Sequence, residues 1–234
     1  MTENTKDFNV IIAVDTTYQN ESFWSSITSD YLPFLAKSFA EMGARVSLQV
    51  VCLGQSLQGH GQDINASPFT QNHADIQQFV DALEIRPCAF NLTKIFRYAA
   101  QEAEKRPLHG LVVFAATQKQ RSKAKSFENE TKPLAVHLKQ LGVTTFIFDN
   151  ADEYNLISSG ISEQFGKAAM WATGLHVSFH SESLRILYEY MKIIGPVVAG
   201  DLAALKRQSG DLITVHGNQL FRKCILKLSP DGTP

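Results

Sequence analysis

The chain has 234 residues, of which 22 are lysine or arginine and 23 are aspartate or glutamate, giving a formal net charge of -1. This near-neutral balance argues against a general nucleic-acid or membrane binder, and 44% hydrophobic with 19% charged residues is typical of one globular domain. The three cysteines are odd in number and far apart, so they suggest neither a disulfide framework nor a cysteine zinc site.

The N-terminal residues 1–7 form a polar tail that leads directly into an apolar segment. There is no signal-peptide pattern, and no apolar run is long enough to span a bilayer. We therefore expect a cytoplasmic protein with neither a membrane nor a nucleic acid as its partner.

The apolar segment 8–14, with the sequence FNVIIAV, is the strongest element and ends abruptly at Asp15. A short, continuous apolar run predicts a strand that is buried on both faces, as in a parallel sheet with helices on each side. Asp15 is then at the carboxyl end of the strand, which is the edge where open α/β sheets bind ligands.

Strand-like and helix-like segments alternate through most of the chain. The further expected strands are short runs at 46–53, 63–69, 110–116, 143–148 and 175–179. Apolar residues three or four apart predict helices over 21–42, from 72 to 83, from 91 or 93 to about 106, over 131–141 and 161–173, and from 181 or 183 onward. This order predicts an α/β fold, with an open, mostly parallel, Rossmann-like sheet and helices on both faces.

Prolines and glycines set the expected interruptions. Pro33 is expected to kink or split the first helix, Pro133 to fall in the first turn of its helix, and Gly195-Pro196 to bend or break the last one. A final strand is possible at 212–215. We divide the chain into the tail, one domain over 8–207 and a C-terminal extension over 208–234.

Several motifs occur in a characteristic order. The first strand ends in Asp-x-Thr-x-Gln, a segment SPFTQNHADIQQFVDAL follows at 67–83, and Thr93 opens an alanine-rich helix. The strand GLVVFAAT comes next, then a Gly-Val-x-x-Phe strand and a helix that ends in glycine. Over residues 9–179 this order resembles a von Willebrand factor A domain, and 161–205 resembles the C-terminal part of bacterial cytoplasmic proteins that carry such a domain.

The resemblance implies a divalent cation at the carboxyl edge of the sheet. The family holds it with an Asp-x-Ser-x-Ser motif, a later Thr and a further Asp, and a partner's carboxylate or hydroxyl completes the shell. Asp15, Thr17 and Thr93 match three of these ligands, whereas Gln19 replaces the second Ser and Thr117 stands near the place of the last Asp. Because a carboxylate is lost, the expected cofactor is none, or weakly bound Mg²⁺ or Ca²⁺.

A basic segment directly follows the strand at 110–116. It carries four alternating cations, Lys119, Arg121, Lys123 and Lys125. On the expected fold it borders the Asp15 edge, where it is either a solvated loop or an anion-facing rim that binds a partner.

His176 and His180 have a spacing that suggests a zinc pair. Residues four apart on a strand share a face but lie too far apart to chelate easily, and no acidic or cysteine partner stands nearby in the sequence. We therefore interpret these histidines as structural.

By resemblance, the expected function is a non-catalytic binding or scaffolding module that engages a protein partner with the carboxyl edge of its sheet. One alternative is a metal-assisted hydrolase or phosphotransfer enzyme that uses Asp15, although Thr17 occupies the place of a second acid. Another alternative is a domain that binds a small anionic ligand through the basic segment.

Overall fold

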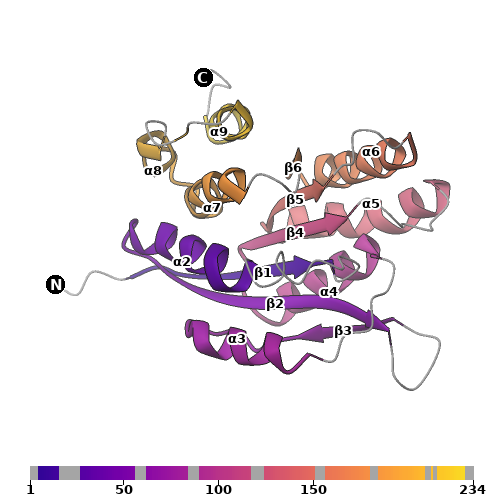
Figure 1. The fold of residues 1–234 in the computed structure, drawn as a ribbon. Helices are drawn as coiled ribbons and strands as arrows, with labels where there is room; N and C mark the ends of the chain where they lie inside the picture. The colour runs from indigo at the N-terminus through magenta and orange to yellow at the C-terminus, as the bar shows by residue number, and fades with distance from the viewer. Residues whose placement is uncertain are drawn as a thin grey trace.

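The computed structural model describes residues 5–15, 27–55, 62–83, 90–116, 124–150, 156–179, 184–208, 212 and 215–229. Within this part of the chain, six strands form one sheet in the order β3-β2-β1-β4-β5-β6 (Figure 1). Neighbouring strands are parallel, except that β3 at one edge runs antiparallel to β2. The predicted α/β fold with an open, mostly parallel sheet is confirmed.

The strands follow the apolar runs of the sequence closely. They are β1 (Asp7–Val14), β2 (Arg45–Gln55), β3 (Gln62–Ala66), β4 (Gly110–Ala116), β5 (Thr144–Asn150) and β6 (Leu175–Phe179). The helices are the π-helical turn η1 (Ile27–Tyr31), α2 (Leu32–Ala40), α3 (His73–Asp81), α4 (Leu92–Lys105), α5 (Ala124–Gln140), α6 (Leu156–Trp171), α7 (Leu184–Ala199), α8 (Leu202–Arg207) and α9 (Val215–Leu228).

The sheet is covered by helices on both faces (Figure 1). On one face, Val10, Ile12 and Val14 of β1 belong to a core that includes residues of α2, α7 and α9. On the other face, Ile11 and Ala13 belong to a core with α4, α5 and α6. Every residue from Val10 to Val14 is at most 1% exposed, which explains why β1 is apolar throughout rather than alternating.

Asparagine side chains begin two of the helices. The Asn72 side chain accepts a hydrogen bond from the Ala74 backbone N–H at 3.1 Å and caps α3. Asn91 accepts from the Lys94 N–H, also at 3.1 Å, and caps α4. Each cap satisfies a backbone donor that the first turn of a helix leaves without a partner. These caps agree with the helix starts that the sequence predicted at 72 and at 91 or 93.

Two expectations at proline are wrong, namely that Pro133 falls in the first turn of its helix and that the last helix breaks at Gly195-Pro196. α5 begins at Ala124 rather than near residue 131, so Pro133 lies inside the helix. α7 continues through Gly195 and Pro196 to Ala199, because Ile194 and Val197 on either side of the step are at most 2% exposed and are held in the core. Tertiary packing outweighs the local cost of proline there.

The break in the C-terminal helices falls at Gly200 instead. Gly200 adopts a φ of +67°, and the Asp201 side chain accepts a hydrogen bond from the Ala204 N–H at 2.8 Å to begin α8. A left-handed φ favours glycine, so this residue ends the helix where the sequence pattern alone pointed to Gly195-Pro196.

The possible strand at 212–215 is not formed by its described residues, because Leu212 is in no strand and Val215 begins the helix α9, while 213–214 lie outside the described ranges. Leu220, Cys224 and Ile225 of α9 join the same apolar core as residues of α7. None of the described helices is long and apolar enough to cross a membrane.

Candidate functional site

Asp15 is next to the place where the connections of the sheet change direction. β1 pairs with β2 on one side and β4 on the other, and the chain leaves β1 toward α2 but leaves β4 toward α5 on the opposite face. The carboxyl ends of such a strand pair form the crevice in which open α/β sheets bind ligands. The Asp15 backbone N–H donates to the Phe114 carbonyl at 2.9 Å and thereby joins the two strand ends. The residue is only 4% exposed.

Thr93 belongs to the same edge of the sheet. It is the second residue of α4, which precedes β4 and runs opposite to it, so the N-terminus of α4 is at the carboxyl edge. The Thr93 hydroxyl is 2.6 Å from the Thr131 hydroxyl of α5, and both residues are buried. This hydrogen bond fixes the start of α4 against α5.

The other predicted site residues lie outside the part of the chain that the structure describes. These are Thr17, Lys119, Arg121 and Lys123, together with the side chain of Lys125, whose backbone is in the first turn of α5. Their assignment as cation ligand or partner-binding residues remains a prediction from the sequence.

The described residues of this edge fit a divalent cation in part. Asp15 supplies one carboxylate, and a Thr93 hydroxyl that donates its proton to Thr131 keeps lone pairs for a metal. Ca²⁺ takes about six to eight oxygen ligands, and Mg²⁺ needs a nearly octahedral set. In the described ranges no three His, Cys, Asp or Glu side chains group as a metal site. Tight binding would therefore need ligands beyond Asp15 and Thr93.

A second buried carboxylate, Asp149, was not predicted as a polar site. The expected strand ended at residue 148, directly before Asp149, but Asp149 lies inside β5 and has no exposed surface. The Nε2 atom of His176 on β6 is 3.2 Å from the Oδ2 atom of Asp149, although this contact does not have hydrogen-bond geometry. The expectation that His176 has no acidic partner nearby is therefore wrong, because the fold brings Asp149 next to it.

Two hydroxyl groups complete the surroundings of Asp149. Ser178 of β6 is its partner in the strand register, and Ser162 reaches over from α6, with the two Oγ atoms 3.2 Å apart. Burial raises the pKa of Asp149, but the His176 imidazole and the two hydroxyls lower it by more, and the net pKa lies below the ordinary value. The cluster holds α6 and β6 against β5.

Gly166 of α6 lies against the His176 ring. A Cβ atom there would lie 3.4 Å from Nδ1 of the imidazole, at van der Waals contact. The parallel register of β5 and β6 and the small residue Gly166 are the features from which the Asp149–His176 pair could have been predicted. Neither is visible when His176 is considered only with its sequence neighbours.

Comparisons with known proteins address the fold. No family model matches the chain, and no curated protein matches it. Among solved structures, the PilB minor pilin from Streptococcus sanguinis aligns with a TM-score of 0.53, 10% identity, and coverage of 83% of this chain and 61% of that one. A single-residue mutant of PilB aligns with a TM-score of 0.56, 12% identity, and coverage of 86% and 63%.

The present chain therefore spans about three fifths of the length of these pilin structures. At 10 to 12% identity the likeness shows a shared fold and carries no residue-level correspondence.

Proposed function

We propose that this chain is a non-catalytic binding or scaffolding module that engages a protein partner through the carboxyl edge of its sheet. The observation that carries the proposal is the position of Asp15, whose backbone joins the ends of β1 and β4 at the switch point of the sheet. A carboxylate at this place lies at the crevice where ligands of open α/β sheets bind.

The Thr93–Thr131 pair supports the proposal because it makes the edge rigid. Two helices on one face of the sheet, α4 and α5, are joined by a buried hydrogen bond between the first turn of α4 and the middle of α5. A preformed surface loses less conformational entropy when a partner binds than a surface that must first be ordered. The edge is thus suited to recognition.

An enzyme that uses Asp15 is the less favoured alternative. Hydrolysis and phosphotransfer need a second titratable group that converges on the reacting atoms. Two described acids have a histidine beside them, Asp149, which is wholly buried, and Glu104, which is at the opposite edge of the sheet from Asp15. The sequence has Thr17 where a second acid would stand. A binding role requires only the surface that Asp15 occupies.

The resemblance to von Willebrand factor A domains is part of the same proposal. In that family an acidic or hydroxyl group of the partner completes the cation shell at this edge. Here we propose weak or no binding of Mg²⁺ or Ca²⁺, because Gln19 and Thr117 occupy positions of family ligands. Isothermal titration with each cation measures this, and micromolar affinity of the unaltered protein would contradict it.

The function is tested by capturing partners from native lysate with the unaltered protein and with Asp15→Asn. A matched control is Glu104→Gln, which removes an exposed carboxylate from the last turn of α4 at the opposite edge of the sheet. We expect a partner that is recovered with the unaltered protein and with the control but lost with Asp15→Asn. Recovery of every partner by a correctly folded Asp15→Asn protein would refute a role for this edge.

A further inference from the structure

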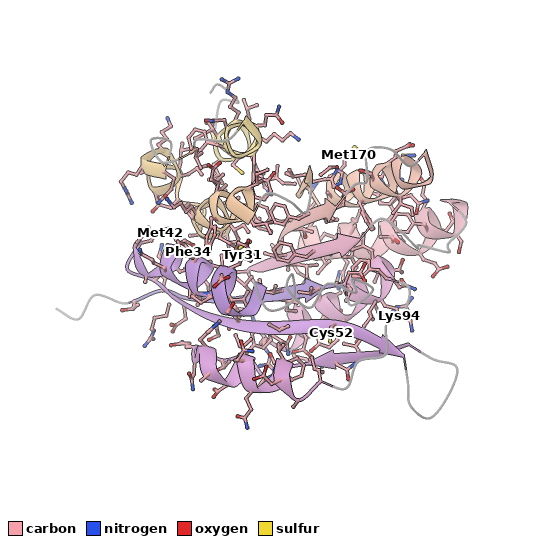
Figure 2. All side chains as sticks on the ribbon, in the orientation of Figure 1. Tyr31, Phe34, Met42, Cys52, Lys94 and Met170 are labelled. Atoms are coloured by element: carbon pink, nitrogen blue, oxygen red, sulfur yellow. The ribbon has the colours of Figure 1, made fainter. Side chains whose placement is uncertain are left out.

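A cavity of about 250 Å³ lies on the outer side of the helices, away from the Asp15 edge. It opens where α2, α7 and α8 meet. Its lining residues are Phe34, Lys37, Ser38 and Glu41 of α2, Lys192 of α7, and Arg207 and Gln208 at the end of α8. Figure 2 labels Phe34 on α2 beside Tyr31, with α8 on the same side of the molecule.

The walls of this cavity are fixed by close packing between α2 and α7. Gly195 of α7 touches Ser38 so closely that a Cβ atom at Gly195 would clash with the Ser38 hydroxyl. The Ser38 hydroxyl donates a hydrogen bond to the Leu35 carbonyl at 2.7 Å and so points back onto the backbone of α2. α8 is positioned by the Gly200 turn and the Asp201 cap, so Arg207 projects from a defined helix rather than from a free loop.

The lining is strongly asymmetric in charge. Lys37, Lys192 and Arg207 contribute three cations and Glu41 one carboxylate, in a chain whose formal net charge is -1. The Lys37–Glu41 ion pair has a 4.0 Å separation and side chains that are 68% and 49% exposed. Such a pair contributes little and leaves Lys37 able to turn toward a ligand. No carboxylate of the described residues pairs with Arg207.

An aromatic ring borders these cations. Phe34 is 36% exposed and meets the Tyr188 ring edge to face, with the ring centroids 4.6 Å apart. Tyr188 supports the ring, so one side of Phe34 offers apolar surface at the cavity. An anion-binding group next to a fixed aromatic ring favours a ligand with one anionic end and one apolar end.

We infer that this cavity binds a small phosphate monoester whose ester group is compact and apolar. The guanidinium of Arg207 suits the bidentate recognition of phosphate, and the lysines add point charges around it. Small-molecule sites measure roughly 300–1,000 Å³, so a cavity of this size admits a single phosphate with a ring or a short chain rather than a dinucleotide.

The test is isothermal titration of the full chain with phenyl phosphate, inorganic phosphate and phenol. We expect phenyl phosphate to bind more tightly than either of the other two, because it alone engages both the cations and Phe34. Equal affinity for phenyl phosphate and inorganic phosphate, or no heat from phenyl phosphate, would overturn the inference.

Two neighbouring cations of α8 provide a matched pair of variants. Arg207→Gln removes a lining cation, whereas Lys206→Gln removes an exposed cation beside it that does not line the cavity. We expect about tenfold weaker binding of phenyl phosphate by Arg207→Gln, the effect of one charge-assisted contact, and unchanged binding by Lys206→Gln. Equal weakening by both would mean non-specific attraction and would overturn the site.

The third variant, Phe34→Ala, separates the two ends of the ligand. It is expected to bring the affinity for phenyl phosphate down to that for inorganic phosphate, and an unchanged preference for phenyl phosphate would overturn the role of the ring. Asp15→Asn is expected to bind phenyl phosphate like the unaltered protein, so this result and the partner-capture result can fail independently.

Discussion

In the described part of the chain, two buried aspartates lie near the carboxyl ends of neighbouring parts of one sheet, and their surroundings differ. Asp149 is enclosed by β5, β6 and α6, with His176 and two serine hydroxyls around its carboxylate. Asp15 is at the crevice between β1 and β4, where the connections leave toward opposite faces of the sheet. Both are less than 5% exposed, so burial alone does not separate them.

The difference lies in what each carboxylate can reach. The neighbours of Asp149 come from the edge strand and the helix over it, so its charge stabilises the packing of this region. Asp15 ends a central strand at the switch point of the sheet, which is the place where open α/β folds bind ligands. A buried acid that is enclosed by a histidine and hydroxyl groups is expected to serve stability, and an acid at a switch point to serve recognition.

The largest expected effect on stability follows from Asp149→Asn. Removal of the charge leaves His176 and the hydroxyls without the anion they surround, and we expect the free energy of unfolding to fall by about 3 kcal/mol. Asp15→Asn is the matched change and is expected to lower it by about 1 kcal/mol or less. Urea denaturation of both variants measures the difference. Equal losses would remove the distinction between the two aspartates.

The next effect is the dependence of stability on pH. The pKa of Asp149 is lower in the folded chain than its ordinary value of 3.8, because His176, Ser162 and Ser178 outweigh burial. A depressed pKa adds stability above the ordinary value, and this stability is lost as the pH falls through the folded pKa. The free energy of unfolding, measured from neutral pH into acid, should therefore fall more steeply below pH 3.8 in the unaltered protein than in Asp149→Asn. Parallel curves would contradict this.

A smaller effect is expected from Ser178→Ala. Ser178 faces Asp149 in the register and its hydroxyl is 3.2 Å from that of Ser162, but the residue is exposed and water can replace part of its interaction. We expect a loss of about 0.5–1 kcal/mol in the free energy of unfolding. Ser126→Ala, which removes an exposed hydroxyl bonded to Glu130, is the control. A loss as large as that of Asp149→Asn would mean that Ser178 is a principal partner of the carboxylate.

Hydrophobic patterning predicted most of the fold. Apolar runs such as Val10–Val14 indicate buried parallel strands because both of their faces are covered, and Asn72 begins a helix as its side chain requires. Pro133 and Pro196 were misjudged because their local cost competes with the packing of long helices. Only the tertiary contacts decide that competition.

The candidate site was predictable to a smaller extent. Asp15 follows from the end of an apolar run and Thr93 from its place near a helix start, because both are local features. The Asp149–His176 pair depends on the register between β5 and β6, which brings together residues far apart in the chain. The cavity beside Phe34 depends on how α8 turns at Gly200. Neither register nor turn direction is encoded in a short motif.

The smallest expected effect on stability belongs to the basic segment after β4. Replacing Lys119, Arg121, Lys123 and Lys125 by serine removes four positive charges from a stretch that follows the strand next to Asp15. If an acidic partner binds this edge, those charges raise the association rate over a Debye length of about 8 Å at physiological ionic strength. The four-fold variant should then associate more slowly and with a weaker dependence on salt, while its thermal stability stays almost unchanged.

The experiment uses the partner that is captured through Asp15, and its association rates are measured at several salt concentrations. The Asp15→Asn variant is the control. Asp15→Asn should reduce the affinity mainly through faster dissociation, whereas the four-fold variant should act on association, because exposed charges steer encounters and a buried group acts once contact is made. Association of the four-fold variant at unaltered rates in low salt would identify the basic segment as a solvated connection. Asp15 would then be the principal charged group of the recognition edge.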